Sequence, residues 1–370
     1  MVDTKELLED LVGFDTVSDK PTIQMFNYVA GILYNLGFDV IKTEEGLYVS
    51  LIAKNKLAEE YEKQGKKYIG LCGHMDTVPF NREEWETNPL KLIEKDNKLY
   101  GLGSADMKGP IACMLKAIED TKDKVPVGLV LTHSEEIGLL GSNELMKTNP
   151  ELMQNMNIVI GEPTNFNLVY THKGFIMYNI TIKGEAKHSS NPKLGLNVIY
   201  GATDLIKKIE SLNNELMSQK TDDFEFGSTT SLGMIGGGSV YNKVCDNVTI
   251  KGDLRLVPGK TKEMFKNMLS REFKLLELQG YKVDYEIITD NPSFYQDPNS
   301  DFIKNLAKLT GKTPSSVNYA TDAAYLSQSC NCAIIGPGDI DVCHQSNEFI
   351  PVEDLDKGVK LYKDILTNQT

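Results

Sequence analysis

The sequence predicts an α/β fold in which a mostly parallel central sheet carries helices on both faces, with a smaller α/β domain inserted into it. In the first half of the chain, and again near its end, short apolar runs alternate with helical patterns. Between about residues 173 and 286 the pattern changes, and residues 175–183 alternate between apolar and polar, which is typical of a strand with one exposed face. A chain of 370 residues is long enough for roughly two or three domains.

The elements of the main domain follow from buried apolar runs and from longer amphipathic segments. The expected strands are residues 67–72, 125–132, 157–160 and 332–335. The expected helices are residues 1–10, 106–120, 141–147 and 353–366. Apolar strands separated by helices are typical of a parallel sheet that is covered on both faces.

The inserted domain has a different order of elements. The expected strands are residues 175–183, 229–235, 244–256 and 281–287, and the expected helices are residues 196–212 and 261–279. The order β-α-β-β-α-β is that of the ferredoxin-like unit. We therefore expect residues 1–172 and 289–370 to form one domain and residues 173–288 to form the insertion.

Composition argues against several classes of partner. The net charge of -13 leaves no basic patch for a phosphate backbone, so no nucleic-acid partner is expected. Because no apolar run reaches the ~18 residues of a membrane span, no membrane partner is expected either. The first ten residues lack the basic and apolar regions of a signal peptide, and the six cysteines are scattered. Reduced thiols in a cytoplasmic protein are the expected state.

Histidine and acidic residues follow the ends of the expected strands. These are His74 and Asp76 after the first strand, Glu135 and Glu136 after the second, Glu162 after the third and His344 after the fourth, and Asp106 joins them from the start of a helix. Ligands of open α/β sheets gather outside the carboxyl ends of the strands, so these distant residues could converge there.

Each of these residues also has an ordinary structural explanation. The explanations are an N-cap for Asp106, a helix-start charge pair for Glu135 and Glu136, and a turn for Glu162. They are a solvated loop for His74 and Asp76, and a surface or satisfied core histidine for His344. Their collection at strand ends nevertheless favours a shared site, because chance would scatter them along helices and exposed faces.

Two histidines with several carboxylates suit divalent ions such as Zn²⁺, Co²⁺ or Mn²⁺. A pair of ions needs one shared carboxylate, and an unligated carboxylate can take the proton of the water that attacks a carbonyl. The chemistry indicated is metal-assisted amide hydrolysis. Residues two apart in extended chain face the same way, so Asp76 could accept the second ring N–H of a metal-bound His74. The sequence contains neither a Gly-x-Ser-x-Gly elbow nor a Walker A pattern.

Seven stretches, taken together, resemble the M20 family of metallopeptidases and amidohydrolases. They are residues 73–79, 100–109, 134–138, 161–164, 186–190, 253–259 and 344–348. The resemblance implies two bound metal ions, with Zn²⁺ preferred and Co²⁺ or Mn²⁺ as alternatives. It also implies a role for each residue: His74 and Glu162 on the first ion, Asp106 bridging both, Glu136 and His344 on the second, Glu135 as general base, and Asp76 orienting His74.

The resemblance further implies that the insertion is a lid and a dimerisation domain of a homodimer. His188 matches the lid histidine that reaches the active site of the other subunit, where it would stabilise an oxyanion. Its ordinary alternative is a polar turn residue. Arg255 matches a residue that grips the substrate carboxylate, and its alternative is an ion pair on a strand surface. Asn242 matches a substrate-contacting asparagine.

The implied substrate is a small N-acyl amino acid. Within the family, the sequence around residues 76–106 and 162–174 is most similar to that of acetylornithine deacetylases. This similarity implies conversion of N2-acetylornithine to ornithine and acetate. Lys243 and residues 318–323 differ from the sequence expected for acetylornithine deacetylases. Succinyl-diaminopimelate desuccinylase, N-acetylcitrulline deacetylase, general aminoacylase and dipeptidase activities stay open as alternatives, as does a metal-free binding module.

Overall fold

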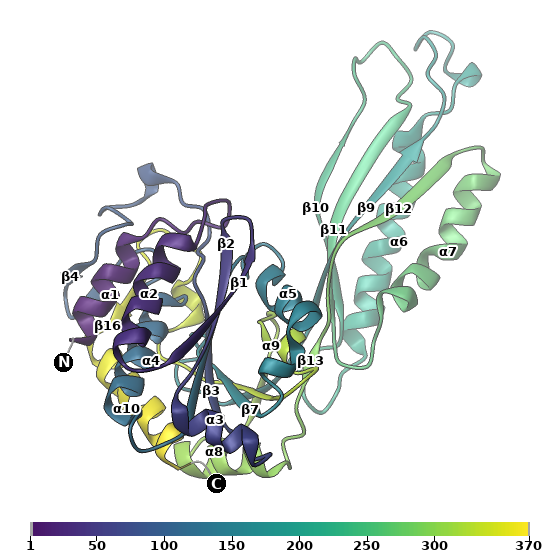
Figure 1. Ribbon diagram of the computed structural model, residues 1–370. Helices are drawn as coiled ribbons and strands as arrows, with labels where there is room; N and C mark the ends of the chain where they lie inside the picture. Colours follow the sequence, from purple (N-terminus) through teal and green to yellow (C-terminus); the bar gives the residue numbers. More distant parts are fainter. Residues whose placement is uncertain (1–2, 369–370) are drawn as a thin grey trace. The chain divides into compact units, whose positions relative to one another are not determined.

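The computed structural model describes residues 3–368, which form two compact units (Figure 1). The large unit comprises residues 3–170, 295–315 and 321–368, and the small unit comprises residues 171–294 and 316–320. The first helix, α1 (Thr4–Gly13), begins near the expected start, while residues 1 and 2 lie outside the described part. In residues 3–368 we find no helix with the length and apolar character needed to cross a bilayer.

Among the described residues, nine strands form the main sheet, most of which belongs to the large unit, in the order β1-β2-β6-β3-β7-β15-β8-β13, with β14 paired to β8. In that order their bounds are Asp39–Glu45, Tyr48–Lys54, Val127–Thr132, Tyr68–His74, Met156–Ile160, Asn331–Ile334, Val169–His172 and Phe294–Tyr295, with β14 at Ser315–Val317. The four central strands β6, β3, β7 and β15 are parallel. They are the four strands predicted from apolar runs, so the expected mostly parallel α/β class is confirmed.

Helices cover both faces of this sheet. Side chains of α1, α2 (Ile23–Asn35), α4 (Lys108–Thr121), α8 (Asp301–Thr310) and α10 (Val352–Thr367) share one apolar core with the sheet. Helices α5 (Leu140–Thr148) and α9 (Ala323–Leu326) lie on the other side (Figure 1). Helix α3 (Lys56–Lys63) adjoins β6. The sheet is buried from both sides, which accounts for the uninterrupted apolar runs.

A smaller sheet in the same unit brings two distant loops together. Its order is β16-β5-β4, with bounds Phe349–Pro351, Lys98–Tyr100 and Ile93–Lys95. Phe349 pairs with Tyr100 in antiparallel register. The residues just before 349 therefore lie beside those just after 100.

The small unit has the β-α-β-β-α-β order that the sequence predicts. Its elements are β9 (Gly174–Lys183), α6 (Val198–Ser218), β10 (Thr229–Gly237), β11 (Asn247–Leu256), α7 (Lys262–Leu278) and β12 (Lys282–Asn291). The sheet order is β10-β11-β9-β12, and all pairs are antiparallel. Alternate residues of β9 pack against the helices, which explains the period-two pattern.

Candidate active site

Predicted site residues of the large unit meet at the carboxyl ends of its parallel strands. His74 is the last residue of β3, and Glu135 and Glu136 lie shortly after β6. Glu162 follows β7, and His344 lies in the loop between β15 and β16. Asp106 precedes α4 but is not its N-cap, because Met107 occupies that position. Parallel strands present their carboxyl ends at one edge, and this is how residues so far apart in sequence converge.

A first group of possible metal ligands, which we call the first triad, consists of His74, Asp106 and Glu162. One donor atom from each lies within 4.8 Å of the others. His74 Nε2 is 3.0 Å from Asp106 Oδ1 and 4.0 Å from Glu162 Oε1. All three side chains are buried.

A second group, the second triad, consists of Asp106, Glu136 and His344 and satisfies the same distance limit. His344 Nε2 lies 3.0 Å from a carboxylate oxygen of Glu136 and 3.4 Å from Asp106 Oδ2. Asp106 therefore turns one oxygen towards His74 and the other towards His344. This carboxylate belongs to both triads, as a bridging ligand must.

The site concentrates negative charge. Burial raises the pKa of the Glu162 carboxyl, and the neighbouring Asp106 carboxylate raises it further. Burial also raises the pKa of Glu135, with added repulsion from Glu162 and Glu136. Hydrogen bonds to Asp106 and Glu136 raise the pKa of His344 to about 10. Carboxylates held this close repel one another unless positive charge is bound among them, so the arrangement suits cations.

Asp76 occupies a different position from the one expected. His74 Nδ1 lies 2.9 Å from the main-chain carbonyl of Asp76, whereas the Asp76 carboxylate is 3.8 Å away. That carboxylate instead accepts the main-chain N–H groups of Glu135 at 2.9 Å and of Glu136 at 3.2 Å. Asp76 thus orients the His74 ring through its main chain and fixes the Glu135-Glu136 segment through its side chain.

His188 and Asn242 lie close together in the small unit, in loops beyond the end of β9. His188 pairs with Lys243 in an isolated bridge, and the Asn242 carbonyl accepts the Ser189 N–H. His188 is exposed, and its Nδ1 accepts the Ser190 N–H at 3.2 Å. A neutral ring whose Nδ1 accepts carries its proton on Nε2, which is then a free donor.

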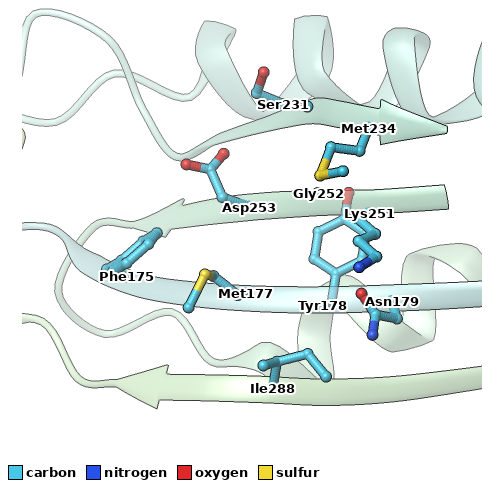
Figure 2. A pocket seen from close by; sticks show the side chains of 11 residues that line it. Phe175, Met177, Tyr178, Asn179, Ser231, Met234, Lys251, Gly252, Asp253 and Ile288 are labelled. Atoms are coloured by element: carbon cyan, nitrogen blue, oxygen red, sulfur yellow. The ribbon is translucent and has the colours of Figure 1, made fainter. Parts of the chain in front are cut away.

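Arg255 lies at the other end of the same sheet, where it is paired in register with Phe175. Its guanidinium carbon is 3.9 Å from the Phe175 ring centroid, and its Nε is 3.3 Å from Asp253 Oδ2. Phe175 and Asp253 also line a groove of about 500 Å³ in the small unit (Figure 2). The strand-surface ion pair considered from sequence is therefore present, and it uses Nε rather than the terminal guanidinium nitrogens.

Two buried carboxylates near the site were not selected from sequence. Glu348 is 2% exposed and accepts main-chain N–H groups of the turn that carries Asp106. Burial raises the pKa of Glu348 to about 7. Asp322 is buried and accepts a hydrogen bond from the Thr132 hydroxyl at 2.5 Å, at the end of β6. The signal for Glu348 was its place in the 344–348 stretch, four residues after His344.

Comparison with known proteins identifies the class. Residues 70–368 match the model of peptidase family M20/M25/M40, and the chain belongs to this family of metal-dependent amidohydrolases. An acetylornithine deacetylase of Vibrio campbellii is 31% identical over 367 residues, covering 95% of this chain and 94% of that protein. One of Vibrio vulnificus is 34% identical over 331 residues, covering 87% and 85%. One of Myxococcus xanthus is 29% identical, covering 94% and 92%.

Solved structures agree on the fold. Aminopeptidase PepT of Bacillus cereus superposes with a TM-score of 0.80 at 22% identity, covering 99% of both chains. An M20 family metallo-carboxypeptidase of Sulfolobus solfataricus gives a TM-score of 0.79 at 19% identity, again covering 99% of both. A Bacillus subtilis protein described as a dinuclear metal-binding M20 peptidase gives 0.72 at 13% identity, covering 98% of this chain and 96% of that one.

Proposed function

We propose that this protein hydrolyses the amide bond of N-acyl amino acids and that its substrate is N2-acetylornithine, which yields ornithine and acetate. The observation that carries the proposal is the pair of triads that share Asp106 beside Glu135, because this set suits metal-assisted amide hydrolysis. The choice of substrate is supported by acetylornithine deacetylases that are 31% and 34% identical over most of the chain.

We assign the first triad to one divalent cation and the second triad to another. Imidazole nitrogens and carboxylate oxygens are ligands of Zn²⁺, which we prefer, with Co²⁺ or Mn²⁺ as alternatives. The crowding of carboxylates supports the same assignment, because their repulsion needs positive charge. Two bound cations would polarise the substrate carbonyl and lower the pKa of a water molecule.

Glu135 is our candidate for the general base. It lies outside both triads, yet it directly precedes the ligand Glu136 and is held by the Asp76 carboxylate. Its carboxylate would accept the proton of the attacking water and then deliver it to the leaving α-amine. Adjacent glutamates thus divide the work, with one binding metal and the other moving the proton.

We further propose that the small unit is the lid and dimerisation domain of a homodimer. Arg255 would hold the substrate carboxylate through its planar fork of donors. The free Nε2–H of His188 would donate to the oxyanion, with Asn242 beside it in contact with the substrate. Because His188 and Arg255 lie at opposite ends of one sheet, a small substrate bound by Arg255 would meet the partner subunit's His188.

We also propose a cytoplasmic location. All six cysteines are free, and each is buried. Reduced cysteines are usual in the cytoplasm, where thiols are kept from forming disulfides. Cell fractionation with an antibody against the protein would test this, and recovery outside the cytoplasmic fraction would contradict it.

A panel of substrates, assayed with and without chelator, tests the proposed reaction. The compounds are N-acetylornithine, N-acetylcitrulline, N-acetylmethionine, N-succinyl-diaminopimelate and a dipeptide. We expect N-acetylornithine to give the highest kcat/KM, and we expect chelation to abolish the activity. A higher kcat/KM for another compound would select that alternative activity. Purified protein without stoichiometric metal, and without activity when metal is added, would favour a metal-free binding module.

A further inference from the structure

We propose that Glu348 is a positioning residue that fixes the Asp106 carboxylate between the two triads. The inference rests on the proposed function, because it concerns how the chain holds the ligand that two cations would share. Glu348 binds main-chain N–H groups of the turn that ends at Asp106, so its effect would act through the main chain of that turn.

Glu348 binds this turn through both carboxylate oxygens. Oε1 accepts the N–H groups of Ala105 at 2.8 Å and Asp106 at 2.9 Å. Oε2 accepts the N–H of Gly103 at 2.8 Å. Three charge-assisted hydrogen bonds from one side chain to three of the four residues 103–106 leave the turn little freedom to tilt. The last of the three bonds is made by Asp106 itself.

The turn depends on the hydrogen bonds to Glu348 because it is tight and lies between β5 and α4, outside regular secondary structure. Gly103 has φ +76°, a conformation that favours glycine, and a Cβ there would meet a Thr77 methyl carbon at 2.8 Å. The main-chain N–H of Gly101 also bonds to the carbonyl of Glu348 at 3.1 Å. These contacts continue the antiparallel pairing of β16 with β5. The register of that pairing fixes the position of residue 348 beside the turn.

The segment that carries Glu348 is itself anchored. The Ser346 hydroxyl donates to a Glu84 carboxylate oxygen at 3.2 Å, and the Asn347 side-chain oxygen accepts the Glu86 N–H at 2.8 Å. His344 has φ +59°, which a residue other than glycine rarely adopts unless its surroundings hold it. These residues, 344–348, form what we call the braced loop. It supplies His344 to the second triad, and its Glu348 binds the turn that carries the shared ligand Asp106.

The chemistry of residue 348 favours a functional role over a purely structural one. Its carboxylate is buried, and its recorded hydrogen-bond partners among residues 3–368 are three main-chain N–H groups. A buried negative charge beside an acidic site is costly for folding. Strict orientation of a metal ligand is a reason to retain such a charge, since groups that support ligands tune metal affinity.

The test compares Glu348→Gln with Glu348→Ala and with Glu353→Gln as control, all in the full-length protein loaded with Zn²⁺. The amide in Glu348→Gln keeps one acceptor oxygen but loses the bond to the Gly103 N–H, whereas alanine removes all three bonds. Glu353 is a matched control because it lies in the first turn of α10, with a side chain 73% exposed. Zinc stoichiometry and affinity are measured by equilibrium dialysis, kcat and KM by assay, and melting temperature with and without chelator.

We expect Glu348→Gln to weaken zinc binding about 10–100-fold, to lower kcat with little change in KM, and to reduce the rise in melting temperature that zinc produces. Glu348→Ala should show a larger loss of affinity, and Glu353→Gln should match the wild type. If Glu348→Gln binds two zinc ions with wild-type affinity and turns over normally, or only melts lower by the same amount with and without zinc, the positioning role is wrong. A wild-type protein that binds no zinc and hydrolyses no acyl amino acid would instead refute the proposed function.

Discussion

His188 and Arg255 lie at opposite ends of the four-stranded sheet in the small unit. Arg255 pairs with Phe175 near the start of β9, whereas His188 follows Lys183 at its end. Phe175 and Lys183 are eight positions apart in this register, which corresponds to about 27 Å of antiparallel strand. An acylated amino acid is much shorter than this, so these two side chains of one chain cannot both contact the same molecule of that kind.

Mixed dimers test this geometry. His188→Ala and Glu135→Gln should each be nearly inactive alone, yet hybrids made from both should regain activity. In a hybrid, the subunit carrying His188→Ala keeps its Glu135 and receives the intact histidine from the Glu135→Gln subunit. Mixing after mild dissociation, followed by assay and by sizing of the complex, provides the measurement. Activity that stays at the level of the separate variants, despite exchange of subunits, would contradict the shared site.

Replacing Glu135 or Glu136 by glutamine should have different effects on metal content and on kcat. Glu135→Gln should keep both metal ions but lower kcat by about 10²–10⁴-fold, which is the usual range for a general base. Glu136→Gln should lose the second metal ion, because Glu136 belongs to the second triad. Metal analysis of both purified variants, together with kcat, separates the two roles. Near-normal turnover by Glu135→Gln would remove it from the role of base.

Asp76→Asn should lower kcat more than it changes KM, by about 10–100-fold, because Asp76 holds the Glu135-Glu136 segment through two main-chain N–H groups. Asparagine offers only one acceptor oxygen in place of two. The control is Ser18→Ala, which removes the Ser18 hydroxyl bond to Asp76 at 3.1 Å but leaves the carboxylate intact. Equal losses in the two variants would mean that the carboxylate does not act through that segment.

Arg255→Lys should lower kcat/KM for the acyl amino acid by about 10–100-fold, mostly through KM. Lysine keeps the charge but lacks the planar fork, and hydrogen bonds to charged groups contribute about 1.5–3 kcal/mol. Arg271→Lys on α7 serves as control, because Arg271 is exposed. An ester or amide of the substrate carboxylate should be hydrolysed equally by wild type and Arg255→Lys. If Arg255→Lys also hydrolysed the ester or amide more slowly than the wild type does, Arg255 would have a structural role instead.

Lys173 predicts a pH dependence of stability. It is buried, donates to the carbonyls of Phe226 and Gly227, and has its pKa lowered to about 8 by burial and by the nearby Arg255. Between about pH 8 and 10.5 the unfolded chain would bind a proton at this site that the folded chain does not, so stability should rise with pH across this window.

Lys173→Met should flatten that rise. Denaturant unfolding of both proteins at several pH values between 7 and 10, in the presence of chelator, measures the difference in slope. The comparison uses slopes because the substitution also leaves two carbonyls unpaired, which changes the absolute stability at every pH. Parallel curves for the two proteins would show that the Lys173 ammonium is not disfavoured in the folded state.

Sequence patterns predicted the parts of the fold that rest on strong periodicity. The parallel strands around Leu71, Val130 and Ile158 stand out because burial on both faces demands continuous apolar residues. The hairpin of β1 and β2 was not predicted, because β1 is an edge strand with polar and charged residues such as Asp39, Lys42 and Glu44. Strands of two or three residues, such as β13, are too short to show any period.

The site was less completely accessible from the sequence. Histidines and carboxylates at strand ends could be selected by residue type, since metal chemistry limits the choice of ligand. The contact of His74 with the Asp76 carbonyl could not, because every residue carries such a group. Glu348 stands in the 344–348 stretch, but its contacts were missed for a related reason, since its partners are main-chain N–H groups, which nearly every residue carries.

The braced loop at residues 344–348 also has a consequence for biosynthesis. His74 and Glu162 leave the ribosome early, but the main-chain N–H of Asp106 is bound by a side chain synthesised more than two hundred residues later. Contacts between such distant segments form slowly, and nascent chains fold from their N-terminus. The growing polypeptide therefore passes through a long interval in which the residues of the first triad are present but the side chain of Glu348 is not. Synthesis of residues 344–348 then adds, in one short stretch, both His344 of the second triad and the carboxylate that binds the turn of Asp106.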